Sequence, residues 1–137
     1  MTDSKIYDEV LIKHNRFPSH KKILSNAQYI LEGINPGCGD EIKLYISFEN
    51  GVISEAAFNG SICALSQTCA DLMLDSIIGK NKEEVTELIE SAYRASEGDE
   101  AGIFPGAEII RSFSESKARS KCTLLGWKTL DKIIKEV

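Results

Sequence analysis

Three cysteines and one aspartate in this 137-residue chain have residue types that could hold one metal ion: Cys38, Asp40, Cys63 and Cys122. Three thiolates and a carboxylate make a four-ligand set that fits tetrahedral Zn²⁺, and the same thiolates could hold an iron–sulfur cluster. Aspartate is a harder ligand than thiolate and would be held more weakly. Such a site could release the carboxylate and open a position for a partner's ligand or a new sulfur.

The spacing of the cysteines is not specific, because no pair has the CxxC pattern. Buried or inert thiols and disulfides therefore stay open as alternatives. A chain of this length without a secretion signal has little need of disulfides, so we expect a reducing compartment, the cytoplasm. The fourth cysteine, Cys69, lies on an apolar helical stripe. It is expected to be a core thiol, with a spare sulfur acceptor as the alternative.

Basic residues lie near one of these positions, Cys122. Arg119 and Lys121 immediately precede Cys122, where they could lower a thiol pKa and steer an anionic partner or a persulfide. They could equally be two solvated bases at the start of a helix. His14 and His20 lie far from the cysteines in sequence and are expected to be surface or capping residues.

Composition limits the remaining possibilities. Hydrophobic residues make up 42% of the chain and charged residues 27%. This balance predicts one globular domain spanning residues 1–137. The net charge of −5 argues against nucleic-acid binding. No apolar run could cross a membrane, and no signal peptide is expected. The charged residues are mostly acidic in the range 83–108 and mostly basic in the range 111–137. This pattern indicates either solvated helices or a basic face that docks an acidic partner.

Hydrophobic periodicity predicts the elements that must position these residues. Apolar side chains at helical spacing predict helices over residues 3–16, 64–79, 82–95, 107–113 and 120–136, with a loop over 97–106. Alternation predicts strands over 41–49 and 52–59, and a weaker signal favours one over 27–34. The fold class is therefore α+β, a three-stranded antiparallel sheet with helices packed on one face.

Turn signals refine this expectation. Asn50-Gly51 predicts a tight hairpin between the last two strands. Asn35-Pro36-Gly37 has the order that a type II turn favours. An extended Cys38-Gly39-Asp40 segment would then point the thiol and the carboxylate to the same side. The core faces of the hairpin strands are expected to be Ile42, Leu44, Ile46 and Phe48 on one strand and Val52, Ala56 and Phe58 on the other.

Four motifs, in order, resemble a known family over nearly the full chain: His14 with Pro18, the run 35–40 (Asn-Pro-Gly-Cys-Gly-Asp), the run 58–66 (Phe-Asn-Gly-Ser-Ile-Cys-Ala-Leu-Ser), and Lys121-Cys122. Through these motifs, the chain resembles the U-type iron–sulfur cluster assembly proteins, the IscU/SufU/NifU N-terminal family. The resemblance implies an α+β fold (SufE/NifU-like) with three cysteines and an aspartate around one exposed metal site.

Two features place the resemblance closest to the SufU branch. The Leu-Pro-Pro-Val-Lys motif of IscU-like proteins is absent before Cys122, and Lys121 stands where those proteins have histidine. The interval between Cys63 and Cys122 is also longer than in IscU, and the run 122–128 looks like the SufU tail.

The SufU resemblance implies a zinc-dependent sulfurtransferase that takes persulfide sulfur from a PLP-dependent cysteine desulfurase (SufS-like) and passes it to downstream iron–sulfur assembly or acceptor proteins. By position, it implies four zinc ligands: Cys38, Asp40, Cys63 and Cys122. Cys38 would accept the sulfur, and Arg119 would match an arginine that is important for function together with the desulfurase. Two positions depart from the family pattern: Ile62 replaces a glycine, and Cys69 replaces a small polar residue.

Two other functions stay open. The same four residues could ligate iron in a non-enzymatic scaffold, on which a [2Fe–2S] cluster is assembled and transferred. The chain could also be a zinc-stabilised interaction module without any transfer activity.

Overall fold

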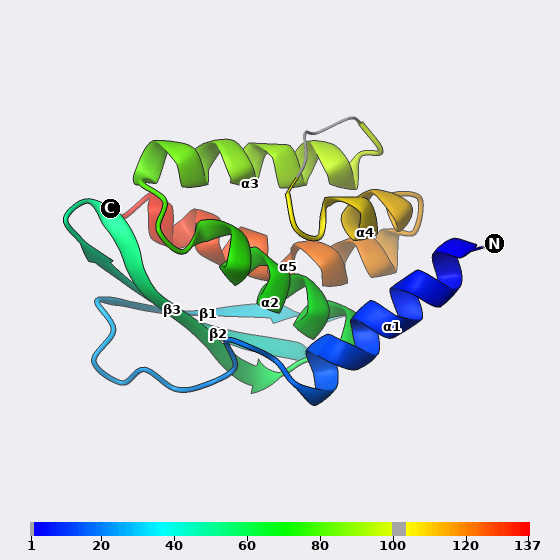
Figure 1. Cartoon of the computed structure of the whole chain (residues 1–137), viewed down its shortest axis with the longest axis horizontal. Helices are drawn as coiled ribbons and strands as arrows, with labels where there is room; N and C mark the ends of the chain where they lie inside the picture. The colour runs from blue at the N-terminus through cyan, green and yellow to red at the C-terminus, as the bar shows by residue number, and fades with distance from the viewer. Residues whose placement is uncertain (1, 100–103) are drawn as a thin grey trace.

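The computed structural model describes residues 2–99 and 104–137. In chain order, the elements are α1 (Thr2–Arg16), β1 (Tyr29–Asn35), β2 (Asp40–Glu49), β3 (Val52–Ser61), α2 (Ala64–Ile77), α3 (Lys82–Ser96), α4 (Ala107–Ser112) and α5 (Lys117–Ile134). Helices α2 to α5 lie on one side of the sheet and α1 packs against α2 near one end of it (Figure 1), which confirms the predicted fold class. Of the predicted loop over 97–106, residues 100–103 lie outside the described residues.

The three strands form one antiparallel sheet in the order β1-β2-β3. The β2–β3 hairpin turns at Asn50 and Gly51, which both have positive φ, as a two-residue hairpin turn of the primed type requires. Ile42, Leu44 and Ile46 are buried on the core face of β2, as their alternation predicts.

The predicted core face of β3 was wrong at Val52, the first residue of the strand. The pairing of β2 with β3 shifts register between Ser47 and Phe48. A bulge of this kind changes which side chains point inward. As a result Ile53 is fully buried in the core, and Val52 is only half-buried.

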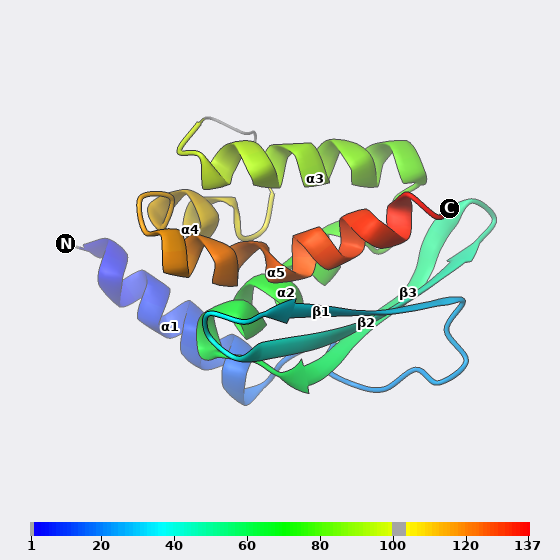
Figure 2. The same ribbon diagram turned by 180° about the vertical axis from the view of Figure 1, so that it is seen from behind.

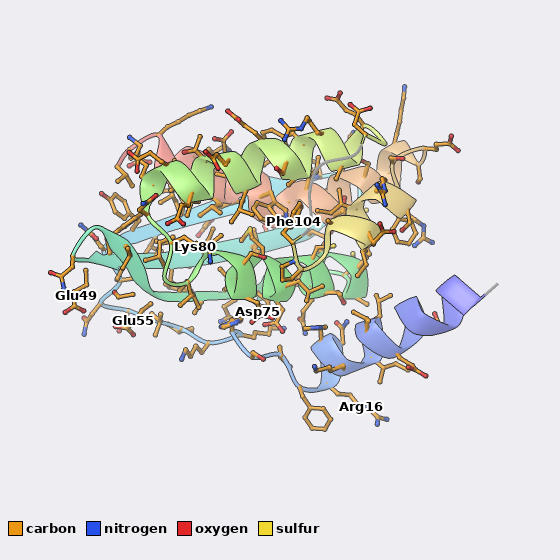
Figure 3. All side chains as sticks on the ribbon, turned by 45° about the horizontal axis from the view of Figure 1, so that its top comes forward. Arg16, Glu49, Glu55, Asp75, Lys80 and Phe104 are labelled. Atoms are coloured by element: carbon orange, nitrogen blue, oxygen red, sulfur yellow. The ribbon has the colours of Figure 1, made fainter. Side chains whose placement is uncertain are left out.

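Helices α2 and α5 pack against each other over the sheet, and α3 forms an outer layer on α5. Figure 2, the view from behind, shows α5 running along β1. Trp127 of α5 lies in the centre of this core, and Phe104 (labelled in Figure 3) meets it edge to face with 5.5 Å between the ring centroids. Among the described residues, no helix is both long and apolar enough to cross a membrane.

Helix α5 begins earlier than its apolar periodicity predicts. Ser116 caps it, because its hydroxyl oxygen accepts a hydrogen bond from the Arg119 backbone N–H. The helix therefore starts at Lys117 rather than at Ser120, which places Cys122 in its second turn.

A buried polar cluster joins α1 to α2. Asp71 is 0% exposed, and its carboxylate accepts hydrogen bonds from His14 Nδ1 at 2.6 Å and from the backbone N–H groups of Ser19 and His20. One turn further along α2, Asp75 accepts from His20 Nε2 at 2.6 Å. The expectation of a surface or capping role for His14 was wrong, because its ring is buried at this helix contact.

Candidate metal centre

Three of the four predicted ligands converge at one end of the sheet. Ligand atoms of Cys38, Asp40 and Cys122 all lie within 4.8 Å of one another. The Sγ atoms of Cys38 and Cys122 are 3.3 Å apart. Cys38 comes from the turn between β1 and β2, Asp40 from the first residue of β2, and Cys122 from α5. Packing of α5 on β1 and β2 therefore assembles the group.

The turn that carries Cys38 differs from the one expected. The Cys38 N–H donates to the Asn35 carbonyl at 3.3 Å, so the chain does turn there. Gly37 has no positive φ, which a type II turn would require. The left-handed residue is instead Gly39, at φ 71°. Cys38 and Asp40 therefore converge through a bend at Gly39, not along an extended segment.

The fourth predicted ligand, Cys63, borders this group but is not within it. Cys63 caps the N-terminus of α2, where its Sγ accepts a hydrogen bond from the Ser66 N–H at 3.4 Å. Its backbone N–H donates to Asp40 Oδ1 at 2.8 Å. The structure thus ties Cys63 to the site through the aspartate, with its thiol half-exposed.

Gly60 permits the close approach of the strand that leads to Cys63. Its φ is 131°, and a Cβ atom at this position would lie 2.1 Å from the Glu41 carbonyl oxygen. Any larger residue would push the end of β3 away from the start of β2, where Asp40 lies.

Two residues at the site were missed by the sequence analysis. Asn35 Nδ2 lies 3.7 Å from Cys122 Sγ and can donate to it. Ser66 donates its hydroxyl proton to Asp40 Oδ2 at 2.9 Å. The position of Ser66 three residues after a helix-capping residue could have identified it, but cysteine is not among the residue types that usually cap helices.

The thiols of the site influence one another. Burial, followed by the neighbouring Cys38 and Cys63 thiols, raises the pKa of the Cys122 thiol to about 12. Cys122 is therefore a neutral thiol at pH 7 when no cation is nearby, and a bound cation would have to displace its proton.

Cys69 is a core residue, as its place on the apolar stripe predicts. It is 3% exposed in a small apolar cluster with Leu65, Ile109 and Cys122, and Val10 and Leu11 of α1 pack against this cluster. Burial raises the pKa of the Cys69 thiol well above its usual range, with smaller contributions from Cys63 and Cys122.

We expect Cys69 to resist alkylation in the folded, metal-free protein, because both burial and a raised pKa suppress its thiolate. Cys38 is exposed and should react readily. Iodoacetamide labelling followed by peptide mass spectrometry measures both rates. Equal labelling of Cys69 and Cys38 without denaturant would contradict the burial, and labelling in urea provides the control for full reactivity.

The bases near Cys122 lie outside the ligand group. Arg119 is exposed in the first turn of α5, and its guanidinium carbon lies 5.6 Å from the centre of the Phe113 ring. This is a cation–π arrangement. Lys121 is exposed and lines a surface pocket together with residues 34–37, Leu125 and Lys128. Both cations are accessible to a partner that approaches Cys38.

The donor set suits zinc or an iron–sulfur centre. Two thiols and a carboxylate already lie together, and Cys63 supplies a third thiol at their border. Sulfur-rich sets with few ligands favour Zn²⁺ or iron–sulfur centres over Mg²⁺ or Ca²⁺, which take oxygen ligands. The exposure of Cys38 leaves the site open on one side.

Sequence comparisons relate the chain to one family. The family model for the NifU-like N-terminal domain matches residues 6–136. The iron–sulfur cluster assembly scaffold protein IscU of Thermotoga maritima is 37% identical, over 100% of this chain and 98% of that protein. The zinc-dependent sulfurtransferase SufU of Bacillus subtilis is 29% identical, over 93% of this chain and 88% of that protein.

Solved structures show the same fold. A crystal structure from Fervidobacterium islandicum, described as a putative iron–sulfur cluster assembly scaffold protein for the SUF system (FiSufU), superposes with a TM-score of 0.84 at 32% identity. The alignment covers 90% of this chain and 93% of that one. The NifU-like N-terminal protein of Brucella abortus has a TM-score of 0.84 at 21% identity, over 99% of this chain and 96% of that one, which supports the fold alone.

Proposed function

The chain belongs to the NifU-like N-terminal domain family of iron–sulfur cluster assembly proteins, and on this premise we propose that it is a zinc-dependent acceptor of persulfide sulfur. The donor would be a PLP-dependent cysteine desulfurase, as the SufU resemblance implies. The observation that carries the proposal is the exposed Cys38 thiol, which lies against the buried Cys122 thiol and the Asp40 carboxylate.

In this proposal Cys38, Asp40, Cys63 and Cys122 hold the zinc ion, which supplies positive charge that keeps thiols deprotonated at neutral pH. Asp40 is the hardest and least firmly held of the four ligands. Its carboxylate accepts hydrogen bonds from the Ser66 hydroxyl and from the Cys63 backbone N–H.

The transfer itself is a thiol–disulfide type of exchange. The Cys38 thiolate attacks the outer sulfur of the desulfurase persulfide and forms a new S–S bond. The S–S bond of the donor breaks, and its cysteine leaves as a thiolate. No electrons are gained or lost overall, and the sulfur remains on Cys38 for a downstream acceptor.

The position of Arg119 fits a role in docking the desulfurase. Its guanidinium lies on the surface, one turn before Cys122, and it rests on Phe113. Phe113 in turn packs against the cluster that contains Cys122. A partner anion bound there would lie one helical turn from Cys122.

The test of this function is desulfurase turnover. With L-cysteine as substrate and a reductant present, alanine production by a SufS-type desulfurase should rise several-fold when the zinc-loaded protein is added. No increase at any ratio of the two proteins would contradict the proposal.

A second candidate function is a scaffold for a [2Fe–2S] cluster, which the 37% identical Thermotoga relative favours by its description. The same four residues would ligate the cluster. Anaerobically purified protein separates the candidates, because a zinc protein is colourless and a cluster protein absorbs visible light.

Zinc affinity should fall steeply as the pH is lowered. The Cys122 thiol, with a pKa of about 12, must lose its proton when it binds zinc, so each pH unit below neutrality should weaken binding about tenfold through this group alone. Competition with a chromophoric chelator, at neutral pH and at mildly acidic pH, measures this slope. A Cys122→Ser variant should show a smaller slope, and a pH-independent affinity would contradict thiolate ligation.

A further inference from the structure

Ser66 lies behind the candidate ligands, in the first turn of α2, with only 2% of its surface exposed. Its hydroxyl donates to Asp40 Oδ2 at 2.9 Å and lies 3.3 Å from Cys63 Sγ. Its backbone N–H donates to the same sulfur at 3.4 Å. Ser66 therefore contacts both Asp40 and Cys63, and these two candidate ligands come from different parts of the fold.

We propose that Ser66 is a positioning residue for the metal centre, which holds the Asp40 carboxylate toward Cys38 and Cys122. This inference rests on the proposed function, because it assigns a role within the same site. Outer hydrogen bonds of this kind orient metal ligands, and their loss commonly weakens metal binding about 10- to 100-fold.

The geometry around Asp40 supports this role. The residue is 3% exposed, so water reaches its carboxylate poorly. The Cys63 N–H donates to Oδ1, and the Ser66 hydroxyl donates to Oδ2. The backbone donor cannot be removed by a side-chain substitution, whereas the hydroxyl can. Without the Ser66 hydroxyl, Asp40 Oδ2 loses this donor. The carboxylate can then rotate while it keeps the hydrogen bond from the Cys63 N–H to Oδ1.

The position of Ser66 also connects the helix to the site. The bond between its N–H and Cys63 Sγ caps α2, while its hydroxyl reaches across to the first residue of β2. Ser66 thus adds a side-chain link between the start of α2 and the start of β2, beside the bond from the Cys63 N–H to the Asp40 carboxylate. Replacing it with alanine keeps the backbone bond and removes the link to Asp40.

The experiment is Co²⁺ titration of the metal-free, full-length protein, followed by visible absorption. In Ser66→Ala we expect about 10- to 100-fold weaker binding. We also expect changed cobalt d–d bands, which report the ligand geometry and which a loss of stability alone would not alter. The matched control is Ser76→Ala on the same helix, because Ser76 is also buried but its hydroxyl donates to the Leu72 carbonyl, away from the site. This control should bind cobalt like the wild type.

A double-mutant cycle with Asp40→Ala tests the route of the effect. If Ser66 acts through Asp40, its substitution should cost little more once the carboxylate is gone. Fully additive losses would overturn the proposal, as would a Ser66→Ala titration and spectrum identical to those of the wild type. If the wild type itself bound no cobalt, that result would contradict the proposed metal centre, and the role of Ser66 in that centre would be contradicted as a consequence.

Discussion

Replacing Cys38 with alanine should return desulfurase turnover to its unstimulated level. The proposed transfer needs an accessible thiolate, and Cys38 is the exposed cysteine of the group, whereas Cys122 is buried and Cys63 caps α2. Without the Cys38 sulfur, the group loses its exposed nucleophile for the outer sulfur of the persulfide. Alanine release from L-cysteine, measured at saturating protein, reports the loss directly.

The matched control for this prediction is Cys69→Ala. Cys69 is a cysteine of the same region but lies buried in the apolar cluster with Cys122. Its removal should preserve most of the stimulation, with a modest loss of stability from the smaller side chain. Undiminished stimulation by Cys38→Ala would contradict the role of Cys38 as acceptor. Equal losses in the two variants would contradict it as well, because they would trace the effect to a disturbed core.

Replacing Asp71 with alanine should destabilise the protein strongly. The carboxylate is fully buried and accepts hydrogen bonds from His14 Nδ1, the Ser19 N–H and the His20 N–H. Its removal leaves the buried His14 ring without this acceptor and takes away one of several links between the end of α1 and α2. We expect the free energy of unfolding to fall by about 3 kcal/mol. Urea denaturation of the metal-free protein measures this change without a contribution from bound metal.

Asp75→Ala provides the comparison, because Asp75 lies one turn further along α2 and also accepts a hydrogen bond from a histidine. Asp75, which is labelled in Figure 3, has a side chain that is 41% exposed. Water therefore screens the pair, which should contribute less than about 1 kcal/mol. Equal effects of the two substitutions would contradict the importance of burial. An Asp71→Ala protein within error of the wild type would show that α1 is not held by this cluster.

Local patterns predicted the elements of the fold well. Alternation located β2, the Asn50-Gly51 pair located the hairpin, and apolar periodicity located the helices. What local patterns could not supply was pairing between distant residues. His14 and Asp71 are 57 positions apart, and no spacing rule connects a histidine at the end of one helix with a carboxylate inside another.

Of the candidate site, too, the sequence predicted the residue types but not the contacts between distant residues. Residue chemistry selected four ligands, and the structure brings Cys38, Asp40 and Cys122 together, with Cys63 at their border. The bend at Gly39 was not predicted, because Pro36-Gly37 has an equally good turn sequence slightly earlier in the chain. Ser66 was missed because its role depends on Asp40, which is near it only in the folded chain.

The measurement that tests the central claim most directly is zinc K-edge X-ray absorption of the protein loaded with one equivalent of zinc. The account predicts three sulfur ligands at about 2.3 Å and one oxygen ligand at about 2.0 Å. Replacing any one of Cys38, Cys63 and Cys122 should lower the number of sulfur ligands in the absorption data by one. A zinc ion surrounded mainly by nitrogen and oxygen, or a protein that retains no stoichiometric zinc, would contradict it.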